Sequence, residues 1–486
     1  MNVTRAEGAT GALPQHRVWG AAAISLTLAL ILAYVAAQIG LAVWAGRGAK
    51  SDADYLVAGR SLGPFAVGMS LFATWFASES LIATSGEVAR DGLAGARAEP
   101  FAYALGILAI ALFFAHRLRS GGFITIADFL RSRFGPATES SAAIVIAISA
   151  TTWSAAQLFA FATIIVSASG LDFTTALVGA TLLVMTYTLF GGLAGDVVTD
   201  IVQGIIIVVA IVILFALMAS AFGGVGAMAA AAPPTIWSFT VPGESWVERL
   251  ELWLIPIAGT MVSQEALART LGARSPDVAR RGALWGAGIY LTVGLIPVSF
   301  GLFGPALAPL LGVTFGADEA FLPSFAAALF PPWMMIVFTG ALVSAILSSV
   351  DSALLAVSAV VTESGYKRLN PNASPLALLR AARTATVGAA AGAAVLAAQG
   401  ESLRDLVLDA GAIAAVLAIP IIAGLAGSTA RRAALGAIAV QAGVWSVLDL
   451  GLGMPGAFLW MIASGALTFA ALSRWDARAE AATTTP

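Results

Sequence analysis

The feature that most constrains this chain is a series of apolar runs, each close to the roughly 20 residues that a helix needs to cross a bilayer. Thirteen such runs follow one another along the 486 residues. They span residues 20–44, 64–86, 98–115, 139–168, 172–190, 195–218, 247–268, 282–305, 333–362, 381–399, 404–426, 432–449 and 455–473. The sequence therefore predicts an all-α integral membrane protein with about 13 transmembrane helices.

The composition agrees with this prediction and excludes several kinds of function. Only 11% of the residues are charged, less than half of the roughly 25% usual in soluble proteins, so they cannot cover a water-facing surface. The absence of cysteine excludes disulfides, thiolate metal sites and cysteine nucleophiles. A net charge of −2 offers no basic surface for nucleic acid. We expect the lipid bilayer as a partner, and nothing in the composition predicts an enzyme.

The basic residues predict how the chain is oriented. Of the 25 lysines and arginines, nineteen, Arg269 among them, lie in segments that face one side of the membrane if the runs alternate, and six face the other. Because basic residues collect on the cytoplasmic side, we expect a multi-pass protein of the cell membrane with the N-terminus outside and the C-terminus in the cytoplasm. Residues 1–18 and 474–486 are then tails on a single transmembrane domain, 19–473. The short apolar stretch 320–330 is expected at the surface.

Four of the spans carry unusual polar or helix-breaking residues, at positions 67–81, 191–200, 255–266 and 344–352. In the seventh span, Pro256 and Gly259 are expected to interrupt the helix and to free backbone carbonyls. The second span, with its small polar residues, stands five spans earlier. Two such spans at corresponding positions indicate a transporter built from inverted repeats, with its site near the middle of the membrane. We expect a 5+5 repeat of spans 2–6 and 7–11, at about 64–218 and 247–426.

The ninth span holds the most specific chemistry. Ser348, Ser349, Asp351 and Ser352 lie within about one and a half helical turns, and Ser348 and Ser352 share one face. Hydroxyl and carboxylate oxygens suit a small alkali cation that has lost its water. A carboxylate in the membrane interior is costly, so Asp351 must face a partner or a wet cavity. The alternative is structural: the serines bond to carbonyls of the preceding turn, and Asp351 pairs with a neighbouring helix.

Three separated motifs carry a family resemblance. They read DYLVAGRSLG at 54–63, YTLFGGLAGDVVTDIVQG at 187–204 and ALVSAILSSVDSALLAVSAVVTE at 341–363. In this order they resemble the sodium/solute symporter family. Within it, residues 73–76 and 117–129 and the spacing around Arg269 resemble most closely the choline-transporter-like branch. The resemblance implies a LeuT-type fold with one leading helix, the 5+5 inverted repeat and two trailing helices. It also implies Na⁺ as the coupling ion.

The resemblance further implies where the ions bind. The positions that match the main sodium site of the family are the backbone carbonyls of Ala73, Phe76 and Ala345 and the hydroxyls of Ser348 and Ser349. Some family members hold a second sodium ion. The positions that match this second site are Asp200, Asp351 and Ser352. For Asp200, a structural ion pair remains the alternative.

The solute site is less well defined. Trp75 and Trp153 match two aromatic wall positions of the choline transporters, which enclose a quaternary ammonium group. The position of a third wall tryptophan is Ser263 here. The neighbouring polar residues are Gln264, Glu265 and, one turn beyond Trp75, Glu79. They favour a zwitterion, an amine or another hydrogen-bonding solute. As alternatives, the tryptophans only pack or lie at the interface, and the two glutamates line the outer vestibule or pair structurally.

The sequence therefore predicts a sodium-coupled secondary active symporter that imports a small organic solute by alternating access. Two alternatives remain open. One is a sensor or receptor that keeps a transporter fold without transport, and the other is a proton-coupled carrier or a channel, with Asp200, Asp351 or Glu265 available to take a proton.

Overall fold

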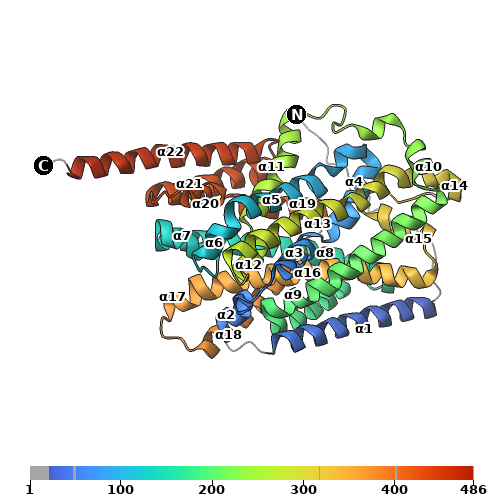
Figure 1. Ribbon diagram of the computed structural model, residues 1–486, viewed down its shortest axis with the longest axis horizontal. Coiled ribbons are helices and arrows are strands. Elements are labelled where there is room, and N and C mark those ends of the chain that lie inside the picture. The colour runs from blue at the N-terminus through green and yellow to red at the C-terminus, as the bar shows by residue number, and fades with distance from the viewer. Residues whose placement is uncertain (1–20, 48–50, 317, 400–401, 485–486) are drawn as a thin grey trace.

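The computed structural model describes residues 21–47, 51–316, 318–399 and 402–484, and all structural statements concern these residues. Apart from one isolated β-bridge between Leu62 and Ala273, their regular structure is helical. Most of the helices lie side by side along the long axis of the molecule (Figure 1). The predicted tail 1–18 lies outside the described residues. The predicted boundary at residue 473 is not a helix end, because α22 continues to Thr484.

The first half of the chain forms ten α-helices with several short 3₁₀ and π-helical turns between them. The α-helices are α1 (Ala21–Gly46), α2 (Asp52–Val57), α3 (Pro64–Trp75), α4 (Thr84–Asp91), α5 (Tyr103–Ala109), α6 (Ala115–Ser120), α7 (Ile126–Phe134), α8 (Pro136–Ser169), α9 (Phe173–Ala221) and α10 (Val225–Ala230). Three π-helical turns, Glu79–Ala83, Arg97–Ala102 and Ile110–Phe114, join or extend the helices between α3 and α6.

The second half forms twelve α-helices. They are α11 (Trp246–Val262), α12 (Gln264–Leu271), α13 (Pro276–Phe303), α14 (Ala308–Leu311), α15 (Phe321–Leu329), α16 (Pro332–Val360), α17 (Lys367–Leu369), α18 (Pro375–Ala397), α19 (Leu403–Ala415), α20 (Ala418–Leu425), α21 (Arg431–Trp445) and α22 (Ala457–Thr484). The last two pack against each other at one edge of the bundle, and α1 packs against α9 at another (Figure 1).

All thirteen predicted spans coincide with helical segments. Two of them are joined in α9, which bends at Gly192, where φ is +56°. A Cβ at this position would lie 2.6 Å from the ring of Tyr55, so glycine is required by space as well as by conformation. Seven of the described helical segments are long and apolar enough to cross a membrane, or eight if the bent pair of α19 and α20 forms one span. The protein is therefore multi-pass, and the number thirteen stays a prediction.

Two helices are broken, as the paired polar spans predicted, but one break lies elsewhere than expected. The first break follows α3, at Phe76 and Ala77. The second separates α11 from α12 at Ser263, whose backbone is extended with ψ of 135°. The helix runs through Pro256 and Gly259, so the expectation that these two residues interrupt it was wrong.

Close packing explains the glycine in α11. A Cβ on Gly259 would lie 2.7 Å from the Cα of Gly411 in α19, so the residue lets two backbones approach each other. The short apolar stretch predicted at the surface forms α15. Its outer residues are exposed, whereas Phe321, Leu322 and Phe325 are buried against the bundle.

Two arginines that the charge alternation placed outside the membrane segments are buried. Arg97 is 4% exposed, and its Nη1 donates to Glu244 Oε2 at 2.7 Å. This hydrogen bond lowers the pKa of Glu244. Arg269 is completely buried in α12. The excess of basic residues on one side remains without it, and the orientation of the termini stays a prediction.

Glycines also bring α3 and α13 into contact, and this packing is testable. A Cβ on Gly282 would lie 2.5 Å from Cβ of Val67 and 3.0 Å from the carbonyl oxygen of Pro64, whereas Gly288 on the same helix has open space around it. We expect Gly282→Ala to destabilise the protein by about 1–3 kcal/mol through overpacking. Gly288→Ala, the matched control, should leave the melting temperature in detergent unchanged or slightly raise it. Equal melting temperatures for the two variants would contradict this account of the interface.

Candidate functional site

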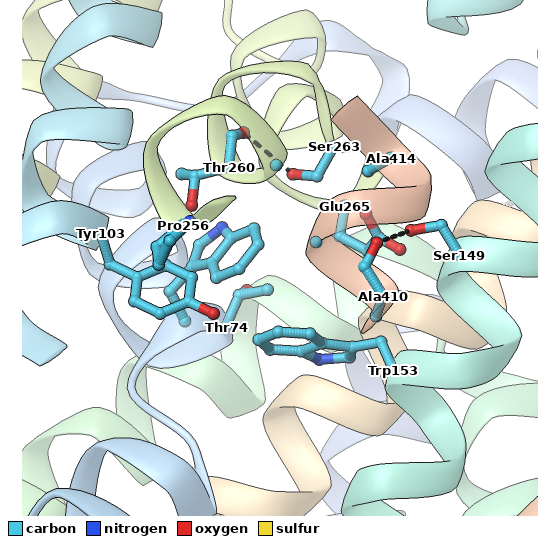
Figure 2. Close-up of a pocket in the computed structure, with 13 residues that line it drawn as sticks. Thr74, Tyr103, Ser149, Trp153, Pro256, Thr260, Ser263, Glu265, Ala410 and Ala414 are labelled. Atoms are coloured by element: carbon cyan, nitrogen blue, oxygen red, sulfur yellow. Dashed lines mark hydrogen bonds between the residues drawn. The ribbon is translucent and has the colours of Figure 1, made fainter. Parts of the chain in front are cut away.

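A pocket lies between the two broken helices. It is lined by Thr74 and Trp75 of α3, Tyr103 of α5, Ser149 and Trp153 of α8, Pro256, Gly259 and Thr260 of α11, Ser263 at the second break, Glu265 of α12, and Ala410, Gly411 and Ala414 of α19. Figure 2 shows these side chains converging from helices that lie far apart in the sequence. The pocket therefore forms only when both halves of the chain are folded together.

One side of the pocket is aromatic. The rings of Trp75 and Trp153 meet edge to face, with centroids 4.8 Å apart, and Tyr103 lies 5.5 Å from Trp75. Edge-to-face contacts fix the ring orientations. The two tryptophans thus lie together on the pocket wall, as the resemblance implied. Tyr103 is a third aromatic wall residue that the sequence did not reveal.

The pocket lining also contains polar groups, including one carboxylate. The hydroxyl of Ser263 donates to the carbonyl of Thr260 at 3.1 Å, and that of Ser149 donates to the carbonyl of Ala410 at 2.8 Å (Figure 2). Glu265 is the only charged residue of the pocket lining and is 8% exposed. Its side chain forms no salt bridge within the described part of the chain. The pocket can therefore offer an apolar face, hydroxyls and one negative charge to a solute.

Two predicted solute-site residues lie outside this pocket. Gln264 is buried, and its Oε1 accepts a hydrogen bond from the backbone N–H of Ile126, at the start of α7, at 2.8 Å. Glu79 lines a neighbouring cavity together with Glu87, Glu99 and Arg404. Its Oε2 accepts from Gln157 Nε2 at 2.9 Å. Of the six predicted residues, Trp75, Trp153, Ser263 and Glu265 line the pocket.

The structure brings together four of the five residues expected at the main sodium site, Ala73, Ala345, Ser348 and Ser349. The hydroxyl of Ser348 donates to the carbonyl of Ala73 at 2.7 Å and to that of Ala345 at 3.0 Å. The hydroxyl of Ser349 donates to the carbonyls of Thr74 at 2.6 Å and Ala345 at 3.1 Å. These oxygens join α16 to the last turn of α3, directly before the break.

Two further observations concern the residues around this cluster. Phe76, the fifth predicted ligand position, is completely buried at the break itself. The carbonyl of Thr74, which the resemblance did not include, lies as close to Ser349 as that of Ala73 lies to Ser348. Neutral hydroxyl and carbonyl oxygens of this kind are hard ligands that fit Na⁺. Their assignment as ligands remains a prediction.

Two of the three residues expected at a second sodium site, Asp200 and Ser352, contact an arginine. Nη2 of Arg269 donates to Asp200 Oδ2 at 3.3 Å and to the hydroxyl of Ser352, and it also pairs with Asp196. The Asp351 side chain is 1% exposed and lies in the preceding position of α16. The alternation of basic residues had placed Arg269 in a loop. The burial of Arg269 could have been predicted from Asp196 and Asp200. These two aspartates share one helical face within an apolar span, and two buried carboxylates require a buried cation.

An all-helical bundle with two broken helices that meet at a pocket is typical of a secondary transporter. Comparison with known proteins assigns the family. The profile of the sodium:solute symporter family matches residues 55–440. The chain belongs to this family, and sodium is its coupling ion.

Several characterised relatives are similar over most of the chain. The sodium/glucose cotransporter of Vibrio parahaemolyticus is 28% identical over 73% of this chain and 71% of its own length. The high-affinity choline transporter 1 of Drosophila melanogaster is 25% identical over 75% of this chain and 60% of its own length. The high-affinity proline transporter PutP of Bacillus subtilis (strain 168) is 29% identical over 65% and 68%, respectively. Relatives with different solutes are thus about equally similar.

Solved structures confirm the fold. A Na⁺-coupled sialic acid symporter in a substrate-bound outward-open state superposes with a TM-score of 0.76 at 18% identity, covering 92% of this chain and 96% of that one. A nucleobase-cation-symport-1 family transporter in a closed conformation gives a TM-score of 0.58 at 16% identity, covering 87% and 95%. The LeuT-type fold implied by the sequence is therefore confirmed.

The position of Gln264 leads to a prediction. We expect Gln264→Met to destabilise the protein by about 1–3 kcal/mol, because it leaves the buried N–H of Ile126 without its acceptor. The half-saturating solute concentration should stay within twofold of wild type, since the side chain does not reach the pocket. Gln203→Met is the matched control, because Gln203 is equally buried and its side-chain atoms form no hydrogen bond within the described residues. Thermal unfolding and solute uptake are measured on both variants, and a tenfold loss of solute affinity in Gln264→Met would contradict this placement.

Proposed function

We propose that this protein is a sodium-coupled symporter that imports a small amine or zwitterion by alternating access. The observation that carries the proposal is the pocket between the broken helices, whose lining combines the carboxylate of Glu265 with the rings of Trp75, Tyr103 and Trp153. Aromatic faces attract a cationic group, and a carboxylate pairs with it. The choline and proline transporters among the relatives also carry solutes with a positively charged nitrogen.

We further propose that Na⁺ binds between α3 and α16, to Ala73, Phe76, Ala345, Ser348 and Ser349. The hydroxyls of Ser348 and Ser349 donate to carbonyls of Ala73 and Thr74 at 2.7 and 2.6 Å. When Na⁺ enters, the hydroxyls turn their lone pairs towards the ion, and both the hydroxyls and the carbonyls become ligands. The ion then bridges the broken helix and α16, which favours the conformation with a formed pocket.

The proposal includes the arrangement in the membrane. The core repeats are residues 64–218 and 247–426, within one transmembrane domain of residues 19–473. The N-terminus faces outwards and the C-terminus faces the cytoplasm. Basic residues are more frequent in the segments on the same side of the membrane as the C-terminus, and such residues collect on the cytoplasmic side.

Uptake into proteoliposomes tests the proposed function. Vesicles with an inward sodium gradient are supplied with radiolabelled choline, betaines, amino acids or simple amines, and a proton gradient replaces the sodium gradient in parallel. Sodium-driven accumulation of one of these solutes is expected. Uptake driven by protons alone would favour the proton-coupled alternative, and absence of any uptake with solute binding intact would favour a receptor.

The sodium site gives a separate prediction. We expect Na⁺, but not K⁺, to raise the melting temperature of the purified protein, and Ser348→Ala combined with Ser349→Ala to abolish this effect, since two of five oxygen ligands are lost. Ser358→Ala is the matched control, because Ser358 is a buried serine of the same helix whose hydroxyl donates to the carbonyl of Ala382 at 3.0 Å. This control should keep the full sodium effect. An unchanged sodium effect in the double variant would exclude the proposed ligands.

The charge in the pocket gives another prediction. For the solute with the strongest sodium-driven uptake, we expect Glu265→Gln to raise the half-saturating concentration at least tenfold, because a charge-assisted contact is worth about 1.5–3 kcal/mol. Sodium stabilisation without solute should persist. Glu251→Gln serves as control, since Glu251 lies on α11 and accepts hydrogen bonds from backbone N–H groups of Gly456 and Phe458 rather than lining the pocket. If Glu265→Gln transports the solute with unchanged affinity, the solute does not pair with this carboxylate.

A further inference from the structure

The guanidinium of Arg269 lies at the centre of a buried polar network, and all three of its nitrogens donate hydrogen bonds. Nε donates to the hydroxyl of Ser70 at 3.1 Å, and Nη1 donates to the carbonyl of Glu265 at 3.0 Å. Nη2 donates to Asp196, to Asp200 and to the hydroxyl of Ser352. An arginine that is completely buried must be fixed by such contacts, because an unpaired buried charge is very costly.

This network joins four elements around the break in α3. Ser70 belongs to α3, the two aspartates to α9, Arg269 to α12 and Ser352 to α16. The hydroxyl of Ser70 also donates to Asp200, and that of Ser352 donates to the carbonyl of Ser348 at 2.6 Å. The guanidinium therefore occupies a position one helical turn from the serines of the proposed sodium site.

The second sodium site that the family resemblance implies would lie at the same position. A second sodium ion held by Asp200, Asp351 and Ser352 must bridge α9 and α16. In the structure, Nη2 of Arg269 already bridges them, from Asp200 to Ser352. Three carboxylates, those of Asp196, Asp200 and Asp351, act electrostatically on this one guanidinium. Without Arg269, they would form an oxygen-rich, strongly negative cage of the kind that attracts a small cation.

We propose that Arg269 is a tethered cation that takes the place of a second coupling sodium, so that this protein binds one Na⁺ per transport cycle. The inference rests on the proposed sodium-coupled function. A guanidinium cannot dissociate from the protein, so it offsets one of the negative charges of the aspartates without drawing on the sodium gradient. Arg269 does not contact the proposed sodium ligands directly, and it acts on transport as a positioning residue.

Sodium binding to the purified, full-length protein tests the inference. Equilibrium binding of radioactive ²²Na⁺ gives the number of ions per protein and the Hill coefficient. We expect one bound ion and a hyperbolic binding curve for the wild type. The double variant Ser348→Ala with Ser349→Ala should bind no ion at the proposed sodium site between α3 and α16. In Arg269→Ala the stoichiometry should rise to two. Methylguanidinium, which fits the space left by the side chain, should displace the added ion and restore a stoichiometry of one.

Two further variants separate this role from simple structural support. Arg269→Lys keeps the tethered charge and should still bind one sodium ion. Arg269→Ala combined with Asp196→Asn removes one positive and one negative charge together, and it should gain the second ion even where the single variant folds poorly. Combining Arg269→Ala with Ser349→Ala should weaken the original sodium site and leave the added one.

The outcomes distinguish this inference from the proposed function. Two bound sodium ions in the wild type would overturn the tethered cation and leave sodium symport intact. So would a single bound ion in both Arg269→Ala and Arg269→Ala with Asp196→Asn. Absence of sodium-driven uptake by a wild type that binds one ion, together with two ions in Arg269→Ala, would refute symport and support the tethered cation.

Discussion

Every peptide group that loses its helical hydrogen-bond partner at a helix break must find another partner inside the protein, because the membrane interior offers no water. The break after α3 leaves the carbonyls of its last turn without their helical donors. Here the hydroxyls of Ser348 and Ser349 supply those donors to Ala73 and Thr74. The same oxygen atoms form a set of hard ligands, so the requirement that holds the broken helix in place also creates the proposed ion site.

Much of this arrangement could be predicted from the sequence, since it depends on local length and polarity. The thirteen apolar runs coincide with helices, and small polar residues in an apolar run marked the break after α3. The place of the second break could not be predicted in this way. Pro256 lacks an N–H and still remains within α11. Ser263, which has no helix-breaking property of its own, is where the chain becomes extended.

The site was predictable only where its residues lie on one helix or match a motif. Ser348 and Ser349 meet α3 because both helices lie in the core of the fold. Gln264 and Glu265 are neighbours in sequence, yet one bonds to the start of α7 and the other lines the pocket. Which of them faces the solute depends on the rotation of the short helix α12, and this rotation is fixed by distant residues. The burial of Arg269 follows from the same rotation, since its partners Asp196 and Asp200 lie on α9.

Thr74 shows how the pocket, the proposed sodium site and the arginine network depend on each other. Its side chain lines the pocket, and its carbonyl accepts from Ser349 at 2.6 Å. Its hydroxyl donates to the carbonyl of Ser70 at 2.7 Å, and Ser70 in turn accepts from Arg269. A movement of this one turn of α3 therefore changes all three places at once. If ion and solute both favour the position of this turn seen here, each raises the affinity for the other by the same factor, as linkage requires. The broken helix thus provides a physical route for coupling that needs no contact between the ion and the solute.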